Sequence, residues 1–186
     1  MLAKQSEFTI RPTNENDWEN VRALRLEMLR DTPIAFGETV QDALGHDEAE
    51  WRVRAARGQR PQSISLAAIT GDGQWIGGMG AYLKGRQPLL VGVYVAPSHR
   101  GRMAGVTDAL LAGILSWTAQ YGDVLWLEVH EDNRRAIKAY ERRGFQRTGA
   151  TRPYELDPSR CEIEMSKHLD LTATPGGTPK FVESRL

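Results

Sequence analysis

The chain has 186 residues, of which 40% are hydrophobic, a combination typical of one globular domain with a full core. The numbers of basic and acidic side chains are equal at 24 each, which excludes a global field drawing the chain to nucleic acid or to an anionic membrane. The single cysteine, Cys161, excludes an intramolecular disulfide. No apolar run has the length of a signal-peptide core or a membrane span, so a cytoplasmic protein is expected.

The first third of the chain predicts one strand followed by two helices. The strand is EFTIRP, after which Thr13 or Asn14 would cap a helix running to about Arg30. Apolar residues recur in this helix at intervals of three and four, which indicates one buried face. The stretch DTPIAFGETV ends it, and a second, more polar helix is predicted over about residues 39–58.

Three strands and a buried helix are predicted next. Residues 63–70 and 75–83, SISLAAIT and WIGGMGAYL, are apolar runs joined by GDGQ, which is a hairpin signal. The third strand, residues 88–96, stops at Pro97. From Val106, apolar residues recur at offsets of 3, 4, 8 and 11, the pattern of a buried helix face.

The last predicted elements are a strand, a short helix and two further strands. The strand covers residues 123–129, and the helix covers 133–143 and is closed by Gly144. The final strands are FQRTGA (145–150) and CEIEMSKHL (161–169).

This order of elements predicts a mixed sheet. A strand, crossover helix and strand across residues 88–130 imply a parallel pair, whereas the earlier hairpin implies an antiparallel region. We expect a single domain over residues 1–169. Residues 170–186 are rich in Pro, Gly and Thr and predict a loosely ordered tail.

The turn RGRMAG, between the third strand and the buried helix, is a candidate anion site. A helix that starts directly after a strand presents unpaired backbone N–H groups and the positive end of its dipole. Gly101 and Gly105 leave that backbone accessible, and Arg100 and Arg102 add positive charge. A pyrophosphate would fit there, although many such turns only connect two elements. The turn matches neither the GxxxxGK[ST] nor the GxGxxG nucleotide pattern.

A second segment, LWLEVHEDNRRAIKAYERRGF, places Glu128, Asn133, Tyr140 and a GF pair at spacings that packing does not require. Together with the turn and the strand order, this resembles the GNAT superfamily of acyl-CoA-dependent N-acyltransferases. The resemblance follows the element order over roughly residues 6–168 and is sharp over 91–145. The catalytic segment is most similar to the ribosomal-protein N-terminal alanine acetyltransferases.

The resemblance implies an α/β (α+β) fold, in which a mixed, mostly antiparallel twisted sheet has a central splayed parallel strand pair and about four flanking helices. It also implies acetyl-CoA as co-substrate, with its pyrophosphate on the turn, its pantetheine arm on a bulged strand end and a further contact from the next helix. The departure from the family pattern is Met103, where glycine is usual. The implied cofactor-binding residues are Val93, Tyr94, Val95, Arg100, Gly101, Arg102, Met103, Ala104, Gly105 and Asn133.

The resemblance gives Glu128 the role of general base and Tyr140 that of general acid. An ammonium must lose a proton before it can attack, and a leaving thiolate needs one. Two structural readings stay open, because Tyr140 could be a core residue and Glu128 could face solvent. The stretch HEDN does not predict a metal site, since four adjacent residues cannot converge on one ion.

Two classes of function remain for the chain. One is an acetyltransferase acting on a primary amine of a small molecule or a protein, and the other is a degenerate acyl-CoA-binding sensor or interaction module. A homodimer is left open. The resemblance places the acceptor beside residues 31–60 and the loop 150–160. Acidic residues there could attract a cationic acceptor or form a solvated helix face; they are Glu38, Asp42, Asp47, Glu48 and Glu50.

Overall fold

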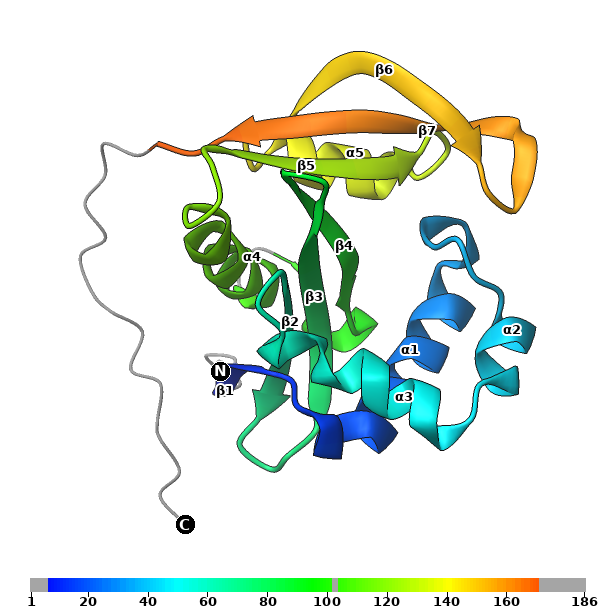
Figure 1. Ribbon diagram of the computed structural model, residues 1–186, viewed down its shortest axis with the longest axis vertical. Helices are drawn as coiled ribbons and strands as arrows, with labels where there is room; N and C mark the ends of the chain where they lie inside the picture. The colour runs from blue at the N-terminus through cyan, green and yellow to red at the C-terminus, as the bar shows by residue number, and fades with distance from the viewer. Residues whose placement is uncertain (1–6, 102–103, 171–186) are drawn as a thin grey trace, which may run out of the picture.

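The computed structural model describes residues 7–101 and 104–170, which form one seven-stranded sheet with five α-helices (Figure 1). The strand order is β1-β2-β3-β4-β5-β7-β6, and every neighbouring pair is antiparallel except β4–β5. The predicted mixed GNAT-like sheet is therefore confirmed. The strands are β1 Phe8–Pro12, β2 Ser63–Thr70, β3 Trp75–Lys84, β4 Gln87–Val95, β5 Val124–His130, β6 Gln146–Tyr154 and β7 Asp157–His168.

The helices agree with the prediction except in the second. They are α1 Trp18–Asp31, α2 Val40–Gly45, α3 Glu48–Ala55, α4 Val106–Thr118 and α5 Arg134–Glu141. The prediction of a single helix over 39–58 is wrong. Asp47 caps a new helix by accepting a hydrogen bond from the Glu50 backbone N–H. A 3-10 turn, η3 Ala56–Gln59, follows α3. The tail predicted over 170–186 lies outside the described residues beyond Asp170.

The entry to α1 distinguishes between the two candidate caps. Asn14 takes the cap position of a short 3-10 turn, η1 Glu15–Asp17, which leads directly into α1. Thr13 is buried instead, and its hydroxyl donates a 2.7 Å hydrogen bond to the backbone carbonyl of Ala55. Thr13 thereby ties the start of the chain to the end of α3.

Helices cover both faces of the sheet (Figure 1), and each face has its own core. On one face α4 packs on β2–β4 through residues such as Leu110 and Ile114, which are fully buried. On the other face α1 and α3 pack through Leu29 and Trp51. A ligand that reaches the middle of the sheet can therefore contact elements from both layers.

The parallel pair β4–β5 is very short. Its register contains only Leu89 opposite Trp126 and Leu90 opposite Leu127. Beyond Leu90 the two strands diverge, and β4 also shifts its register against β3 at Gly92, where φ is +61°. Only glycine adopts this backbone conformation readily, so Gly92 makes the bulge that turns β4 away from its neighbour.

The strands β6 and β7 are longer than predicted. Most of the loop expected over 150–160 belongs to them, which leaves a tight turn at residues 155–156. Pro153 is compatible with β6, because β6 is an edge strand, where proline is tolerated. The Tyr154 hydroxyl donates a 2.8 Å hydrogen bond to the Phe36 carbonyl and fastens this hairpin to the segment after α1.

Candidate active site

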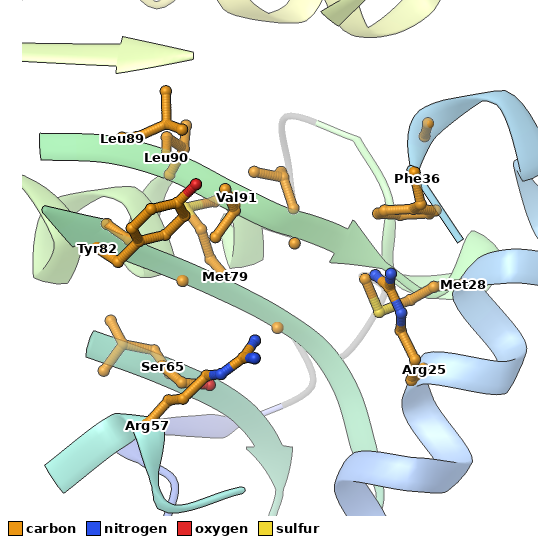
Figure 2. A pocket seen from close by; sticks show the side chains of 18 of the residues that line it. Arg25, Met28, Phe36, Arg57, Ser65, Met79, Tyr82, Leu89, Leu90 and Val91 are labelled. Atoms are coloured by element: carbon orange, nitrogen blue, oxygen red, sulfur yellow. The ribbon is translucent and has the colours of Figure 1, made fainter. Parts of the chain in front are cut away.

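A cavity of about 740 Å³ opens where β4 and β5 diverge (Figure 2). Its lining joins elements from both layers: the helices α1, α3 and α5, the turn η3, the strands β2–β5 and, at its edge, β6 and β7. Three of the residues singled out in the sequence, Glu128, Asn133 and Tyr140, line this one cavity. The structure thus brings together side chains that the sequence connects only by their spacing.

The bulged end of β4 forms one wall of the cavity. Val91, Gly92 and Val93 line it, and β5 does not pair with β4 at this height. Tyr94 and Val95, also predicted to contact the cofactor, have buried side chains. The Tyr94 hydroxyl donates a 2.8 Å hydrogen bond to Glu27 on α1, and burial together with this glutamate raises the pKa of Tyr94. What this strand end offers a ligand is therefore its backbone.

The RGRMAG turn leads into α4 through two glycines with positive φ, Gly101 at +107° and Gly105 at +69°. A Cβ at either position would meet no atom within 4 Å, so the backbone conformation, not crowding, favours glycine there. The Arg100 guanidinium donates a 2.6 Å hydrogen bond to the Val95 carbonyl and pairs with Asp31, so its charge is already engaged. Two predicted contacts, Arg102 and Met103, lie outside the described residues.

Asn133 caps α5 at the cavity wall. Its side-chain oxygen accepts a 3.2 Å hydrogen bond from the Ala136 backbone N–H. The side chain is almost fully buried, and it lines the cavity. Because the oxygen is used by the helix, the amide nitrogen is the group that Asn133 can turn toward a ligand.

Tyr140 lies two turns along α5 from Asn133, with its ring edge-on to Phe145 at 5.6 Å between centroids. The side chain is half-buried, and burial raises the pKa of its phenol. Within the described residues its hydroxyl has no hydrogen-bond partner. At neutral pH the phenol is therefore protonated and free to donate.

Glu128 lies on β5 with its side chain 14% exposed, and it does not simply face solvent. Its carboxylate oxygens are held by Lys84 at 3.1 Å and by Arg152 at 2.8 Å. Arg152 also pairs with Glu162 at 2.7 Å. Glu128 thus belongs to a balanced group of two carboxylates and two cations, of which all but Lys84 line the cavity.

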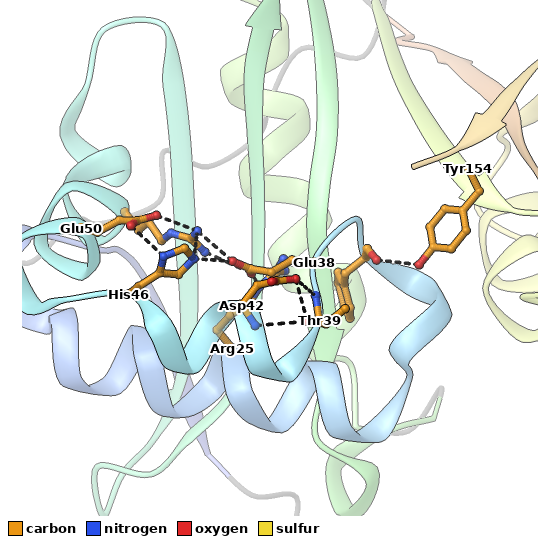
Figure 3. A network of polar contacts seen from close by, with 9 residues as sticks. Arg25, Glu38, Thr39, Asp42, His46, Glu50 and Tyr154 are labelled. Atoms are coloured by element: carbon orange, nitrogen blue, oxygen red, sulfur yellow. Dashed lines mark hydrogen bonds and ion pairs between the residues drawn. The ribbon is translucent and has the colours of Figure 1, made fainter. Parts of the chain in front are cut away.

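The acidic residues that follow α1 form a closed ion-pair network (Figure 3). Glu38 accepts hydrogen bonds from Arg25 and Arg54, both at 2.8 Å, and contacts the His46 ring at 2.7 Å. Burial alone would raise the pKa of Glu38, but Arg54, His46 and Arg25 outweigh it and lower the pKa to about 2. Glu50 joins the network through His46 and Arg54.

The other acidic residues of this region also have partners. Asp42 accepts hydrogen bonds from Thr39 at the start of α2, Asp47 caps α3, and Glu48 pairs with Arg52 at 2.8 Å. Most of this negative charge is therefore matched within the protein and offers little attraction to a cationic acceptor.

Sequence reasoning missed several residues that shape the site. Gly92 could have been found, because a glycine inside the apolar run PLLVGVYVA is a signal for a bulge. Lys84, Arg152 and Arg57 carry no local signal, since their positions depend on contacts between distant segments. Within the described residues, no group of three or more metal-ligating side chains is placed to hold an ion, and no helix is long and apolar enough to cross a bilayer.

Comparisons with known proteins agree with this geometry. Nourseothricin acetyltransferase is 30% identical over 58% of this chain and 66% of its own, with a TM-score of 0.53. A putative acetyltransferase from Salmonella typhimurium, solved with acetyl-CoA, is 20% identical over 93% and 100% of the two chains, with a TM-score of 0.69. Ribosomal-protein-alanine N-acetyltransferase from Brucella melitensis is 22% identical over 87% of this chain and 99% of its own, with a TM-score of 0.69.

A comparison with curated proteins gave no match. The family model of the acetyltransferase (GNAT) family matches residues 22–145, a span that contains the bulged strand, the glycine turn and the cavity side chains of β5 and α5. With the splayed β4–β5 pair and these neighbours of like fold, the match shows that this chain belongs to the GNAT acetyltransferase family.

Proposed function

We propose that this protein transfers an acetyl group from acetyl-CoA to a primary amine by direct attack, with no covalent enzyme intermediate. The observation that carries the proposal is the cavity at the β4–β5 divergence, which gathers Glu128, Asn133 and Tyr140 around an unpaired strand end. The comparisons support acetyl transfer in general, and the two catalytic roles are our assignment.

The chain offers acetyl-CoA a backbone site. Beyond Leu90, β4 has N–H and C=O groups that β5 does not use, and the amides of a pantetheine arm can pair with them as a substitute strand. The N-terminus of α4, entered through Gly105, would hold the pyrophosphate. The Asn133 amide would bind the arm. Acetyl-CoA supplies the activated acyl group.

The two catalytic side chains would handle the protons of the reaction. Glu128, directly or through water, takes a proton from the acceptor ammonium, and the free amine forms a C–N bond with the thioester carbon. As the C–S bond breaks, Tyr140 gives its proton to the sulfur. The proton that the nitrogen releases on becoming an amide restores the phenol. A backbone N–H at the Val93 bulge would stabilise the negative carbonyl oxygen.

A second candidate is an acyl-CoA-binding module without turnover. It would use the same strand end and turn. The ion pairs of Glu128 with Lys84 and Arg152 favour it, because a carboxylate held by two cations can have a purely structural role.

Thiol release from acetyl-CoA in the presence of a panel of primary amines separates the two candidates. The transferase should release thiol only with an acceptor and should yield an N-acetylated product by mass spectrometry. Tight acetyl-CoA binding in calorimetry, without amine-dependent thiol release for any acceptor, would leave the binding module as the function.

A further inference from the structure

Arg57 is a cation on the cavity wall for which the described part of the chain provides no counter-ion. It belongs to η3, and Figure 2 shows its side chain extending from η3 over β2 toward the cavity. Within the described residues no carboxylate lies within ion-pair distance of its guanidinium. The guanidinium is therefore free to bind a ligand.

Apart from Arg60, the other charges around the cavity are matched. Arg25 and Arg54 are held by the network of Glu38 and Glu50, and Lys84 and Arg152 by Glu128 and Glu162. Arg57 remains as a surplus positive charge, with Arg60, also on the lining, beside it in the chain. Arg57 is exposed on the open side of the cavity, yet partial desolvation by the cavity wall and repulsion from Arg54 and Arg60 lower the pKa of its guanidinium. A bound anion would relieve both costs.

The backbone that carries Arg57 is fixed in place. The Arg57 carbonyl accepts a 2.9 Å hydrogen bond from the Ser63 hydroxyl. At the next residue, Gly58, a Cβ would lie 2.3 Å from the Thr13 carbonyl oxygen and 2.8 Å from that of Ser65. Only glycine allows η3 to pack this closely against β2, so the backbone from which Arg57 extends is fixed before any ligand arrives.

We propose that Arg57 binds a carboxylate on the acceptor, so that the substrate of this enzyme is a primary amine that also carries a carboxylate, such as an amino acid. The inference rests on the proposed acetyl transfer. Glu128 and Arg57 line the same cavity and would hold the ammonium and the carboxylate of one zwitterion. A carboxylate suits this site, because the planar fork of the guanidinium matches its two oxygens in shape and charge.

The test compares amino acids with their carboxamides as acceptors, for the wild type and for Arg57→Gln, Arg57→Lys and Arg86→Gln. Arg86 lies in the exposed β3–β4 turn, outside the cavity lining, and serves as the matched control. For Arg57→Gln we expect kcat/KM for amino acids to fall about 10- to 100-fold through KM, the usual effect of a charge-assisted hydrogen bond. Activity with carboxamides should stay unchanged, and Arg57→Lys should recover part of the loss.

Two results would overturn the assignment of Arg57: carboxamides that serve as well as amino acids in the wild type, or equal losses for both acceptors in Arg57→Gln. If no acceptor releases thiol, the proposed function fails, and calorimetric titration of the full chain with the same amino acids decides the binding site on its own. A heat of binding that is lost in Arg57→Gln but kept in Arg86→Gln would support the Arg57 site. The absence of any heat that depends on Arg57 would refute it.

Discussion

The two walls of the cavity are built in different ways. The proposed cofactor wall comes from one continuous stretch, residues 91–145, and would recognise acetyl-CoA mainly through backbone groups at a bulge and a helix start. The proposed acceptor wall is assembled from α1, η3 and the β6–β7 hairpin, where ion pairs hold several of the side chains. Backbone sites leave a spacing pattern in the sequence, whereas side-chain sites depend on long-range contacts.

The largest expected effect is on the affinity for acetyl-CoA, and it tests whether the cofactor wall binds through its backbone. Gly105→Glu places a negative charge at the start of α4, where the pyrophosphate would bind, and should weaken acetyl-CoA binding more than about 100-fold. Gly105→Gln carries the same backbone strain at φ +69° without the charge and should lose much less. Calorimetry measures both affinities, and circular dichroism checks the fold. Equal affinities in the two variants would place the phosphate site elsewhere.

The next largest effect is expected at Glu128, which lies where the two walls meet. Glu128→Gln keeps the shape of the side chain but removes the base, so kcat/KM should fall about 100-fold at low pH, where the acceptor is mostly ammonium. The loss should shrink as rising pH supplies free amine.

Glu162→Gln is the control for Glu128→Gln, because it also frees Arg152 from one carboxylate. It should have only a small effect on the rate. If both variants instead raise KM for the amine without changing kcat, Glu128 acts by charge alone and not as a base.

A stability measurement tests whether ion pairs hold the acceptor wall. The pKa of Glu38 is lowered from 4.5 to about 2 in the folded protein, so its stabilising effect is complete above pH 4.5 and is lost as the pH falls toward 2. Glu38→Gln should therefore lower the free energy of unfolding by about 2 kcal/mol at pH 7, and this gap should close in acid. Glu19→Gln, an exposed change on α1, should cost a few tenths of a kcal/mol at most. Urea unfolding at several pH values measures the gap, and a pH-independent difference would contradict this account.

The smallest expected effect belongs to the general acid. Tyr140→Phe keeps the contact with Phe145 and loses only the proton donor, so kcat should fall about 10-fold with little change in acetyl-CoA affinity. Tyr94→Phe removes a hydroxyl that binds Glu27 outside the main cavity and should leave kcat nearly intact. Equal kcat values for Tyr140→Phe and the wild type would show that Tyr140 is a core residue and not the general acid.

The sequence predicted the order of elements along the chain, the parallel pair and most helices, because periodicity and turn residues are local signals. It also identified Glu128, Asn133 and Tyr140, which line the cavity. It missed the break between α2 and α3, where Asp47 forms a new cap, and the full length of β6 and β7. It could not predict that Glu38 is neutralised, because its partner Arg25 is 13 residues away and Arg54 is 16.

The pairing of β4 with β5 over only two residues affects how substrates could reach the site and how products could leave it. Leu89 and Leu90 are the only positions at which the two strands of the central pair are joined, and beyond them the cavity passes between helices of opposite layers. In the proposed reaction acetyl-CoA and the amine would approach this gap from different walls, so neither would have to pass the other to enter or leave. Binding could then follow either order, and coenzyme A could depart while the acetylated amine is still in place.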